Sequence, residues 1–338
     1  MHTIKVVVIE RGILMSRIAV CGAGGFIGGH LTKKLAHDGH MVLAVDKKPV
    51  DDWYQVTEGT YVLDSHDLSL KPNADSALMG AEQVYMLAAD MGGMGFIENN
   101  KLDCMLSVLT STHTLDAASR LGVDRFFYSS SACVYAADKQ TETSVTALKE
   151  SDAYPAQAED GYGWEKLFTE RMAKHFRDET GLITRVARYH NVYGPYGTFE
   201  GGREKAPAAI IRKVIHAKLT NDMRISIWGD GEQTRSFMYI DDCVKGTMDI
   251  MNSGIEYPIN LGSSELVSIN QLVDIVEEIA DVKLSRRYDL TAPQGVRGRN
   301  SDNTLIQKEL NWEPSITLRD GMEQTFKWIY DEVKPRYN

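Results

Sequence analysis

The chain has 338 residues, 43% of them hydrophobic and 25% charged, so we expect a substantial core and two domains. Its formal net charge of −10 argues against a nucleic-acid-binding surface and against an anchor on anionic membranes. No apolar run approaches the roughly 20 residues of a membrane span. The four cysteines, Cys21, Cys104, Cys133 and Cys243, are scattered without a CxxC or Cys/His cluster. We therefore expect reduced thiols in a cytoplasmic protein, with neither a disulfide framework nor a metal site.

The first 14 residues stand apart from the rest. A short apolar stretch among them is flanked by Lys5, Glu10 and Arg11, so the segment is too short and too charged for a signal peptide. Met15 stands just before the first clear strand. We interpret residues 1–14 as an N-terminal extension or a wrongly assigned start.

A nucleotide-binding βαβ unit follows. Residues 17–21 read as a short buried strand, apolar residues at helical spacing begin at residue 27, and residues 41–46 read as a second strand. The turn between the first strand and the helix fits G-x-G-x-x-G, where glycines permit a tight turn and close approach to a pyrophosphate. The predicted cofactor-binding residues of this turn are Gly22, Gly24, Gly25, Phe26, Ile27 and Gly28.

Asp46 ends the second predicted strand. A carboxylate there can accept hydrogen bonds from a ribose 2′-hydroxyl and would repel a 2′-phosphate, so NAD is favoured over NADP. Lys47 and Lys48 weaken that repulsion, and the alternative is an aspartate that is merely solvated at a strand end.

Further strands are predicted over residues 81–89 and 125–129, with a long helical pattern over 102–121 between them. Strands that alternate with helices predict an α/β fold with a Rossmann-type, doubly wound parallel sheet. Proline and glycine cluster around 194–207 and 293–298, where we expect loops over a site.

A group of reactive side chains follows the strand at 125–129. Ser131 lies just past its end, where open α/β sheets bind ligands. Tyr162 and Lys166 are four residues apart, so they share one face of a helix and the ammonium can lower the phenol pKa. This trio suits hydride chemistry on an alcohol carbon, and Cys133 beside it indicates a second proton transfer. Tyr-x-x-x-Lys alone occurs often by chance, so its setting after a nucleotide-binding unit matters.

With these motifs, the sequence resembles the extended short-chain dehydrogenase/reductase family of nucleotide-sugar enzymes, from residue 16 onward. The resemblance rests on the glycine turn, Tyr162 with Lys166, and the segments 67–68, 87–89, 188–195 and 235–242. It implies that Asp67 lies near the adenine, that Leu87, Ala88 and Ala89 run along the cofactor, and that the stretch after Asn191 lines a sugar-nucleotide pocket.

The same resemblance implies the domain organisation and the oligomeric state. Residues 15–188 and 234–261 would form an NAD-binding domain, and residues 189–233 and 262–338 a smaller, interleaved C-terminal α/β domain for the nucleotide sugar. A homodimer through the helices near 102–121 and 162–178 is expected on the same ground.

Five longer segments resemble one branch of that family, the GDP-mannose 3,5-epimerases. They are residues 88–96, 131–133, 201–209, 228–237 and 295–303. The chemistry agrees, because oxidising C4 of the sugar to a ketone makes the C3 and C5 protons acidic. Tyr162 would act as the base for oxidation, Lys166 would hold Tyr162 ionised, and Ser131 would steady the C4 oxygen. Reduction by the same cofactor would close the cycle.

The resemblance supplies Cys133 and Lys205 as an acid–base pair acting on opposite faces of the sugar. A thiolate can act as base where its pKa is lowered, and an ammonium can donate a proton. Taken alone, Cys133 would more often be a small buried residue and Lys205 a solvated charge.

The remaining candidates bind substrate. Arg299, Arg235 and Lys213 are candidates for the diphosphate, since guanidinium groups suit phosphate oxygens. Asn191 would hydrogen-bond the sugar or nucleotide. The other predicted substrate-binding residues are Gly92 and Met94 in a flexible segment, Ser131, and Glu204 and Ala206 on either side of Lys205.

Three alternatives remain open. A 4,6-dehydratase shares the C4 oxidation but carries Asp-Glu where this chain has Ala132 and Cys133. A 4-epimerase has no use for Cys133 together with Lys205. A non-catalytic NAD-binding regulatory protein would be expected to lose Tyr162 or Lys166, and both are present.

Overall fold

The computed structural model describes residues 15–337, so the segment interpreted as an extension, residues 1–14, lies outside the described residues. A seven-stranded sheet organises the molecule, in the order β11-β6-β5-β4-β1-β2-β3 with every neighbouring pair parallel. Its strands are β1 (Arg17–Cys21), β2 (Met41–Val45), β3 (Tyr61–Leu63), β4 (Gln83–Met86), β5 (Arg125–Ser131), β6 (Ile183–Tyr189) and β11 (Ile259–Leu261). The strand order reverses between β1 and β4, which confirms the predicted doubly wound sheet.

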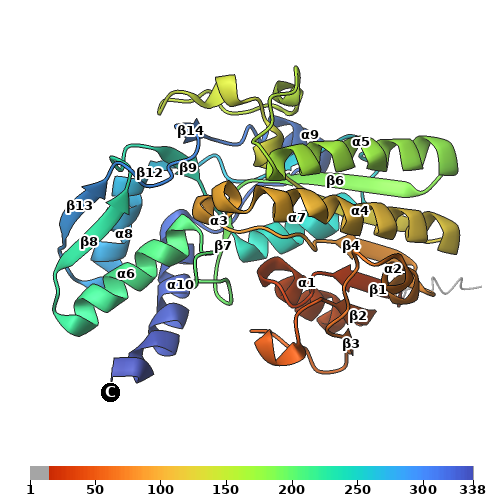
Figure 1. Ribbon diagram of the computed structural model, residues 1–338, viewed down its shortest axis with the longest axis horizontal. Coiled ribbons are helices and arrows are strands. Elements are labelled where there is room, and N and C mark those ends of the chain that lie inside the picture. The colour runs from red at the N-terminus through yellow and green to blue at the C-terminus, as the bar shows by residue number, and fades with distance from the viewer. Residues whose placement is uncertain (1–14, 338) are drawn as a thin grey trace, which may run out of the picture.

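Helices cover both faces of this sheet, because its central strands are apolar on both sides. One face carries α1 (Phe26–His37) and α7 (Ile240–Asn252), which pack against each other. The opposite face carries α2 (Lys71–Leu78), α4 (Lys101–Leu121) and α5 (Tyr162–Thr180). In Figure 1, α4 and α5 run side by side along this second face.

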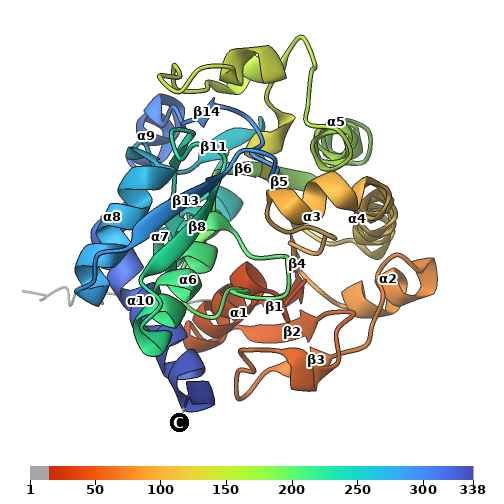
Figure 2. The ribbon, with the colours of Figure 1, turned by 60° about the vertical axis from the view of Figure 1, so that its left-hand side comes forward.

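The C-terminal elements form a second group on the side of the molecule away from α4 and α5 (Figure 2). Three helices pack together there, α6 (Ala206–Thr220), α8 (Ile269–Ala280) and α10 (Leu318–Val333). The small sheets are β8 (Arg224–Trp228) with β13 (Ser285–Asp289), β9 (Thr234–Ser236) between β12 (Leu266–Ser268) and β14 (Gly298–Arg299), and β7 (Val192–Tyr193) with β10 (Met238–Tyr239). Two short helices complete the fold, α3 (Met94–Asn99) and α9 (Thr304–Leu310).

The second predicted strand and the two predicted loops agree with the structure to within a few residues. The strand predicted over 81–89 is shorter than expected, since β4 ends at Met86, where its pairing with β1 also ends at Cys21. Residues 87–89 therefore lie beyond β4, at the side of the sheet where the parallel strands end. The loop that begins at 194 ends at Lys205, the residue before α6.

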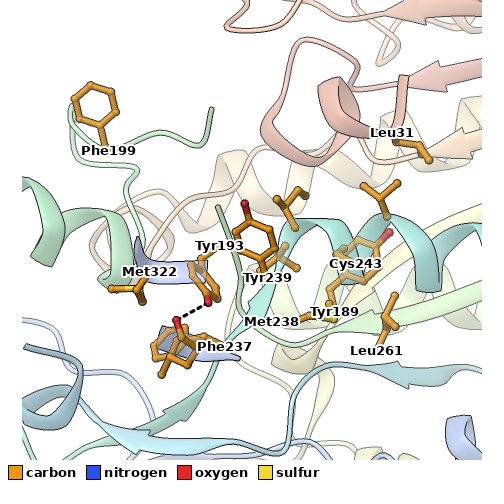
Figure 3. Close-up of a cluster of buried hydrophobic side chains, with 14 of the residues drawn as sticks. Leu31, Tyr189, Tyr193, Phe199, Phe237, Met238, Tyr239, Cys243, Leu261 and Met322 are labelled. Atoms are coloured by element: carbon orange, nitrogen blue, oxygen red, sulfur yellow. Dashed lines mark hydrogen bonds between the residues drawn. The ribbon is translucent and has the colours of Figure 1, made fainter. Parts of the chain in front are cut away.

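One buried cluster ties the second group to the sheet (Figure 3). It joins Leu31 of α1, Tyr193 of β7 and Met322 of α10, each at most 4% exposed. The Tyr193 hydroxyl donates a hydrogen bond to the Leu318 carbonyl over 3.0 Å. Burying each large apolar side chain contributes about 1.5–3 kcal/mol, so this core holds α10 and the neighbouring α6 at a defined place beside the sheet. Within residues 15–337, no helix combines the length and apolar character needed to cross a membrane.

Candidate active site

A cavity of about 810 Å³ lies at the C-terminal edge of the parallel sheet, between the sheet and α6. Most of the predicted cofactor residues line it, and so do several of the predicted catalytic and substrate residues. From the first set the lining includes Gly22, Gly25, Phe26, Ile27, Gly28, Asp46, Asp67, Leu87, Ala88 and Ala89. From the second it includes Gly92, Ser131, Tyr162, Lys166 and Lys205.

The glycine turn has the close packing that a pyrophosphate site needs. Gly22 has a φ of +91°, a conformation that side chains disfavour. A Cβ on Gly28 would lie 2.0 Å from the Gly22 carbonyl oxygen, so only glycine lets α1 start this close to β1. The N-terminus of α1 consequently faces the cavity, where its free N–H groups favour an anion.

Asp46 and Asp67 are held in place by the backbone around them. Asp46 accepts hydrogen bonds from the N–H groups of Gly24 and Lys48, both over 3.0 Å, and its carboxylate lines the cavity. Asp67 accepts from the Ser69 N–H over 2.9 Å and also lines the cavity. A carboxylate fixed at the end of β2 beside a glycine cradle fits the ribose and pyrophosphate of NAD.

Tyr162 and Lys166 lie in the first two turns of α5, both buried. The Lys166 Nζ atom lies 5.4 Å from the centroid of the Tyr162 ring and 4.8 Å from that of Tyr128. Burial raises the pKa of Tyr162 well above its ordinary value, and the side chains of Cys133 and Glu165 raise it further. The Ser131 hydroxyl opposes this shift, as expected of a group that hydrogen-bonds the phenolate.

Glu165 is a buried carboxylate of the site that sequence reasoning missed. Its Oε2 lies 3.6 Å from the Lys166 Nζ, and neither side chain is more than 2% exposed. Its Oε1 accepts hydrogen bonds from the hydroxyls of Ser111, Tyr128 and Thr169. An acidic residue directly before the lysine, on the turn that carries Tyr162, is the sequence signal that could have found it.

Cys133 lies in a short 3₁₀ helix (Ala132–Val134) that continues from β5, and its N–H donates to the Ser131 hydroxyl over 3.2 Å. It packs in a buried cluster with Tyr162 rather than on the cavity lining itself. Its Sγ lies 3.5 Å from Arg299, whose guanidinium also pairs with Glu159 over 2.5 Å. Burial and Glu159 raise the pKa of the Cys133 thiol to about 11, with Arg299 acting in the opposite direction.

Lys205 approaches the cavity from the second group of elements, as the residue before α6. Burial lowers its pKa, which makes its ammonium a better proton donor. Gly93 packs against the same segment: its N–H donates to the Arg203 carbonyl over 3.0 Å, and a Cβ on it would lie 2.3 Å from the Glu204 carbonyl oxygen.

The predicted diphosphate ligands have their donors engaged within the protein. Arg299 donates to Gln140 and Glu159, and Arg235 donates to the carbonyls of Thr234, Gln294 and Val296. Lys213 donates to the Ser226 carbonyl over 2.8 Å. None of the three is in the cavity lining, so their contacts with a diphosphate stay predictions.

Five other predicted residues are not part of the cavity lining. The Asn191 side chain donates to the Ser236 carbonyl over 3.0 Å, and the Glu204 carboxylate accepts from the Gly202 N–H over 2.7 Å. Gly24 lies against the Trp53 ring, Met94 lies against Gly295, and Ala206 begins α6. The roles assigned to these five residues stay predictions.

Two charged residues of the cavity lining, Asp90 and Arg203, were also missed. Asp90 pairs with Lys47 over 2.6 Å and lies 3.6 Å from Arg203. The three come from distant parts of the sequence, and only the fold brings them to one edge of the cavity.

A sequence model of the NAD dependent epimerase/dehydratase family matches residues 18–262, which is more than half of the chain. The chain belongs to this family. Two plant relatives are similar over most of its length. GDP-mannose 3,5-epimerase 1 of Oryza sativa subsp. japonica is 46% identical, covering 94% of this chain and 82% of that protein. GDP-mannose 3,5-epimerase of Arabidopsis thaliana is 44% identical, covering 94% of this chain and 83% of that protein.

Among solved structures, the UDP-glucose 4-epimerase of Thermotoga maritima, determined with UDP-glucose, superimposes with a TM-score of 0.84 at 25% identity. The match covers 94% of this chain and 99% of that chain. The similarity to GDP-mannose 3,5-epimerases that the five segments predicted is thus confirmed, and so is the Rossmann-type fold. For this NAD-dependent epimerase/dehydratase, the glycine turn, Asp46 and Asp67 are the residues that would hold NAD.

Proposed function

We propose that the protein epimerises a nucleotide sugar at C3 and C5, with GDP-mannose as substrate and GDP-L-galactose and GDP-L-gulose as products. One observation carries the proposal: two sets of proton-handling groups lie in the lining of one cavity or directly beside it. Ser131, Tyr162 and Lys166 form the set that every C4 oxidation needs. Cys133, packed against Tyr162, and Lys205, from the other side, form a second set that C4 oxidation alone does not use.

In the first step Tyr162 removes the proton of the C4 hydroxyl, while Lys166 stabilises the phenolate and Ser131 hydrogen-bonds the sugar oxygen. NAD held by the glycine turn, Asp46 and Asp67 would supply the acceptor, and later the donor, of the C4 hydride. Because burial raises the pKa of Tyr162, its phenolate is a strong base for the C4 hydroxyl proton, and Lys166 and Ser131 are the groups that offset this shift.

The C4 ketone acidifies the neighbouring C–H bonds, since the carbanion left by proton removal is an enolate. Cys133 takes the proton on one face, and Lys205 delivers one on the other. Repeating the exchange at the second carbon gives the double epimer. The similarity to plant GDP-mannose 3,5-epimerases supports the choice of guanosine diphosphate sugar and of C3 and C5.

We further propose that the protein is a cytoplasmic homodimer. Large apolar side chains are exposed on the neighbouring helices α4 and α5, among them Leu102 at 70%, Phe168 at 56% and Trp164 at 42%. A second copy of the same pair of helices would bury them. The four cysteines are free and buried, which agrees with a reducing compartment.

The test is to incubate the purified protein with GDP-mannose in heavy water and to analyse the sugar by NMR. Deuterium at C5 and C3 is the expected result. A 4-epimerase would retain protium at both carbons, and a dehydratase would release a 4-keto-6-deoxy sugar. Absence of turnover with every nucleotide sugar tried would instead indicate a non-catalytic NAD-binding protein.

A further inference from the structure

The thiol of Cys133 lies in an environment that keeps it protonated. It is 7% exposed, and burial together with the negative charge of Glu159 raises its pKa to about 11. At neutral pH the group is therefore a thiol, and a thiol has no electron pair basic enough to remove a proton from carbon. The exchange assigned to Cys133 thus needs a second group that takes up the thiol proton.

Glu159 is placed to be that group. Its N–H donates to the Cys133 carbonyl over 2.9 Å, which fixes its backbone beside the cysteine just ahead of α5. Its Oε1 is held by Arg299 over 2.5 Å. Its Oε2 is buried and has no hydrogen-bond partner among the described residues. The Cys133 side chain lies close enough to this carboxylate to help lower its pKa.

We propose that Glu159 is the proton partner of Cys133 and that Arg299 stabilises the thiolate formed when the proton moves. This proposal rests on the proposed epimerase function. It assigns Glu159 as a positioning and proton-accepting residue, and it gives Arg299 a task that its observed contacts support.

The transfer balances in atoms and charge. The S–H bond of Cys133 breaks and an O–H bond forms on Glu159, so the negative charge moves from carboxylate to sulfur. The thiolate then takes a proton from the carbon beside the C4 ketone, whose C–H electrons form the enolate. An N–H bond of the Lys205 ammonium breaks, and its proton is added to the enolate carbon from the other face. Afterwards Glu159 loses its proton to water and Lys205 regains one.

The charges of the buried trio favour this transfer over loss of the thiol proton to solvent, although Arg299 holds the pKa of Glu159 below its ordinary value. Arg299 is 5% exposed and lies within reach of both acceptors, with Nη2 on Glu159 and Nη1 3.5 Å from Sγ. One cation therefore faces one anion before the proton moves and one anion after it. A buried ion pair is maintained throughout, whereas loss of the proton to solvent would leave two anions beside one cation.

The other titratable groups around Cys133 come from several elements. Tyr162 lies beside it at the start of α5, and Lys205 and Arg235 act on it electrostatically from the second group of elements. They stay in place in the variants of Glu159, so the comparison isolates the carboxylate.

The experiment compares Glu159→Gln with Asp160→Asn, a neighbouring carboxylate that is 75% exposed and pairs with Lys101 at the surface. Three quantities are measured on NAD-loaded protein: deuterium uptake at C5 and C3 of GDP-mannose, formation of NADH on mixing with GDP-mannose, and alkylation of Cys133 by iodoacetamide at neutral pH, followed by mass spectrometry. Circular dichroism checks that each variant folds.

For Glu159→Gln we expect deuterium uptake to fall about 100-fold or more, the usual contribution of a proton-transferring group, while NADH formation is retained. Alkylation of Cys133 should become faster, because Arg299 then faces the thiol without a competing carboxylate. Asp160→Asn should match the unmodified protein in all three. A folded Glu159→Gln with undiminished deuterium uptake would overturn the proposal.

Loss of the Glu159 charge leaves Arg299 unpaired, so Glu159→Asp serves if Glu159→Gln does not fold. The Glu159→Asp variant keeps the negative charge but moves the carboxylate away from the sulfur. We expect deuterium uptake to be at least about tenfold slower while NADH formation is retained. An unchanged rate of deuterium uptake would overturn the proposal. Failure of the proposed function looks different: the unmodified protein would then show no uptake from GDP-mannose. In that case, comparing the alkylation rates of Cys133 still tests whether Glu159 controls the reactivity of the thiol.

Discussion

Glu165 and Lys166 form an ion pair in the interior beside Tyr162, with Oε2 and Nζ 3.6 Å apart and both side chains buried. The carboxylate raises the pKa of Tyr162, in opposition to the ammonium that would lower it. The pair therefore places both charges beside Tyr162 without making the tyrosine strongly acidic. A tyrosine that must first accept a proton and later return it to the same sugar is suited by this balance.

Replacing Glu165 by Gln should shift the hydride-transfer step to lower pH. Without the carboxylate the pKa of Tyr162 falls, so the phenolate forms at a lower pH and the rate of NADH formation reaches its plateau earlier on the pH scale. The measurement is a stopped-flow pH profile with GDP-mannose. Glu179→Gln, which removes a 75% exposed carboxylate at the far end of α5, should leave the profile in place. A profile unchanged in Glu165→Gln would show that the pair does not tune Tyr162.

Replacing Cys133 by Ser should separate hydride transfer from proton exchange. A serine hydroxyl is far less acidic than a thiol, so deuterium uptake at C5 and C3 should fall by about 100-fold or more while C4 oxidation continues. Solvent deuterium uptake and NADH formation, measured on the same sample, give the two rates. Undiminished exchange at both carbons would mean that the role assigned to Cys133 is wrong.

Replacing Lys205 by Met should lower activity and raise stability. Burial lowers the pKa of Lys205, so between that pKa and 10.5 the unfolded chain binds more protons than the folded one. The folded state therefore gains stability as the pH rises through this window, and at neutral pH the partly buried ammonium costs stability that methionine restores. We expect a higher Tm together with deuterium uptake reduced about 100-fold.

Lys308→Met is the control for Lys205→Met, since Lys308 is 77% exposed on α9. It should change neither the melting temperature nor the exchange rate appreciably. A lower Tm in Lys205→Met would contradict the expectation that the Lys205 ammonium destabilises the folded state.

Replacing Gly28 by Ala should weaken NAD binding. The new Cβ would lie 2.0 Å from the Gly22 carbonyl oxygen, so the turn must move away from the first strand. Such overpacking costs about 1–3 kcal/mol. Because the cost falls on the conformation of the turn that binds NAD, the Kd for NAD should rise roughly tenfold or more. Isothermal titration with NAD measures it. Gly254→Ala, where a Cβ meets nothing within 4 Å, should bind NAD normally.

Replacing Leu102 and Phe168 together by Glu should produce a monomer. Both side chains are more than half exposed, on α4 and α5 respectively, and two charges in the centre of the proposed interface would have to be buried without partners. Sedimentation velocity distinguishes the two states. Leu290→Glu changes an apolar residue that is 66% exposed elsewhere on the surface and should leave a dimer intact.

The features that sequence reasoning found are those written into short segments. The glycine turn needs only residues 22–28, and Tyr162 with Lys166 needs only the spacing of one helical turn. Both could be predicted because local geometry determines them. The length of β4 could not, because its end is set by where β1 stops pairing, at Cys21 with Met86.

The contacts around the reactive side chains could not be predicted from short sequence segments, for a similar reason. Arg299 reaches Cys133 across 166 positions of the sequence, and the contact depends on how β14 packs against the segment after β5. The sequence suggested a diphosphate ligand because guanidinium groups suit phosphate. Which acceptor a buried arginine meets is decided by the tertiary packing, and here the acceptors are Glu159, Gln140 and the sulfur.

The contact of Gly93 with the Glu204 carbonyl links two segments that border the cavity, one containing Gly92 and the other Lys205. Since no side chain separates their backbones, and an Arg203–Gly93 hydrogen bond joins them, the strip that contains Gly92 cannot swing out while Lys205 stays behind. The two segments would therefore move together when the cavity opens. In the proposed reaction, a sugar at the ketone stage would stay enclosed until Lys205, the residue before α6, has also withdrawn, and this would protect the reactive intermediate from early escape.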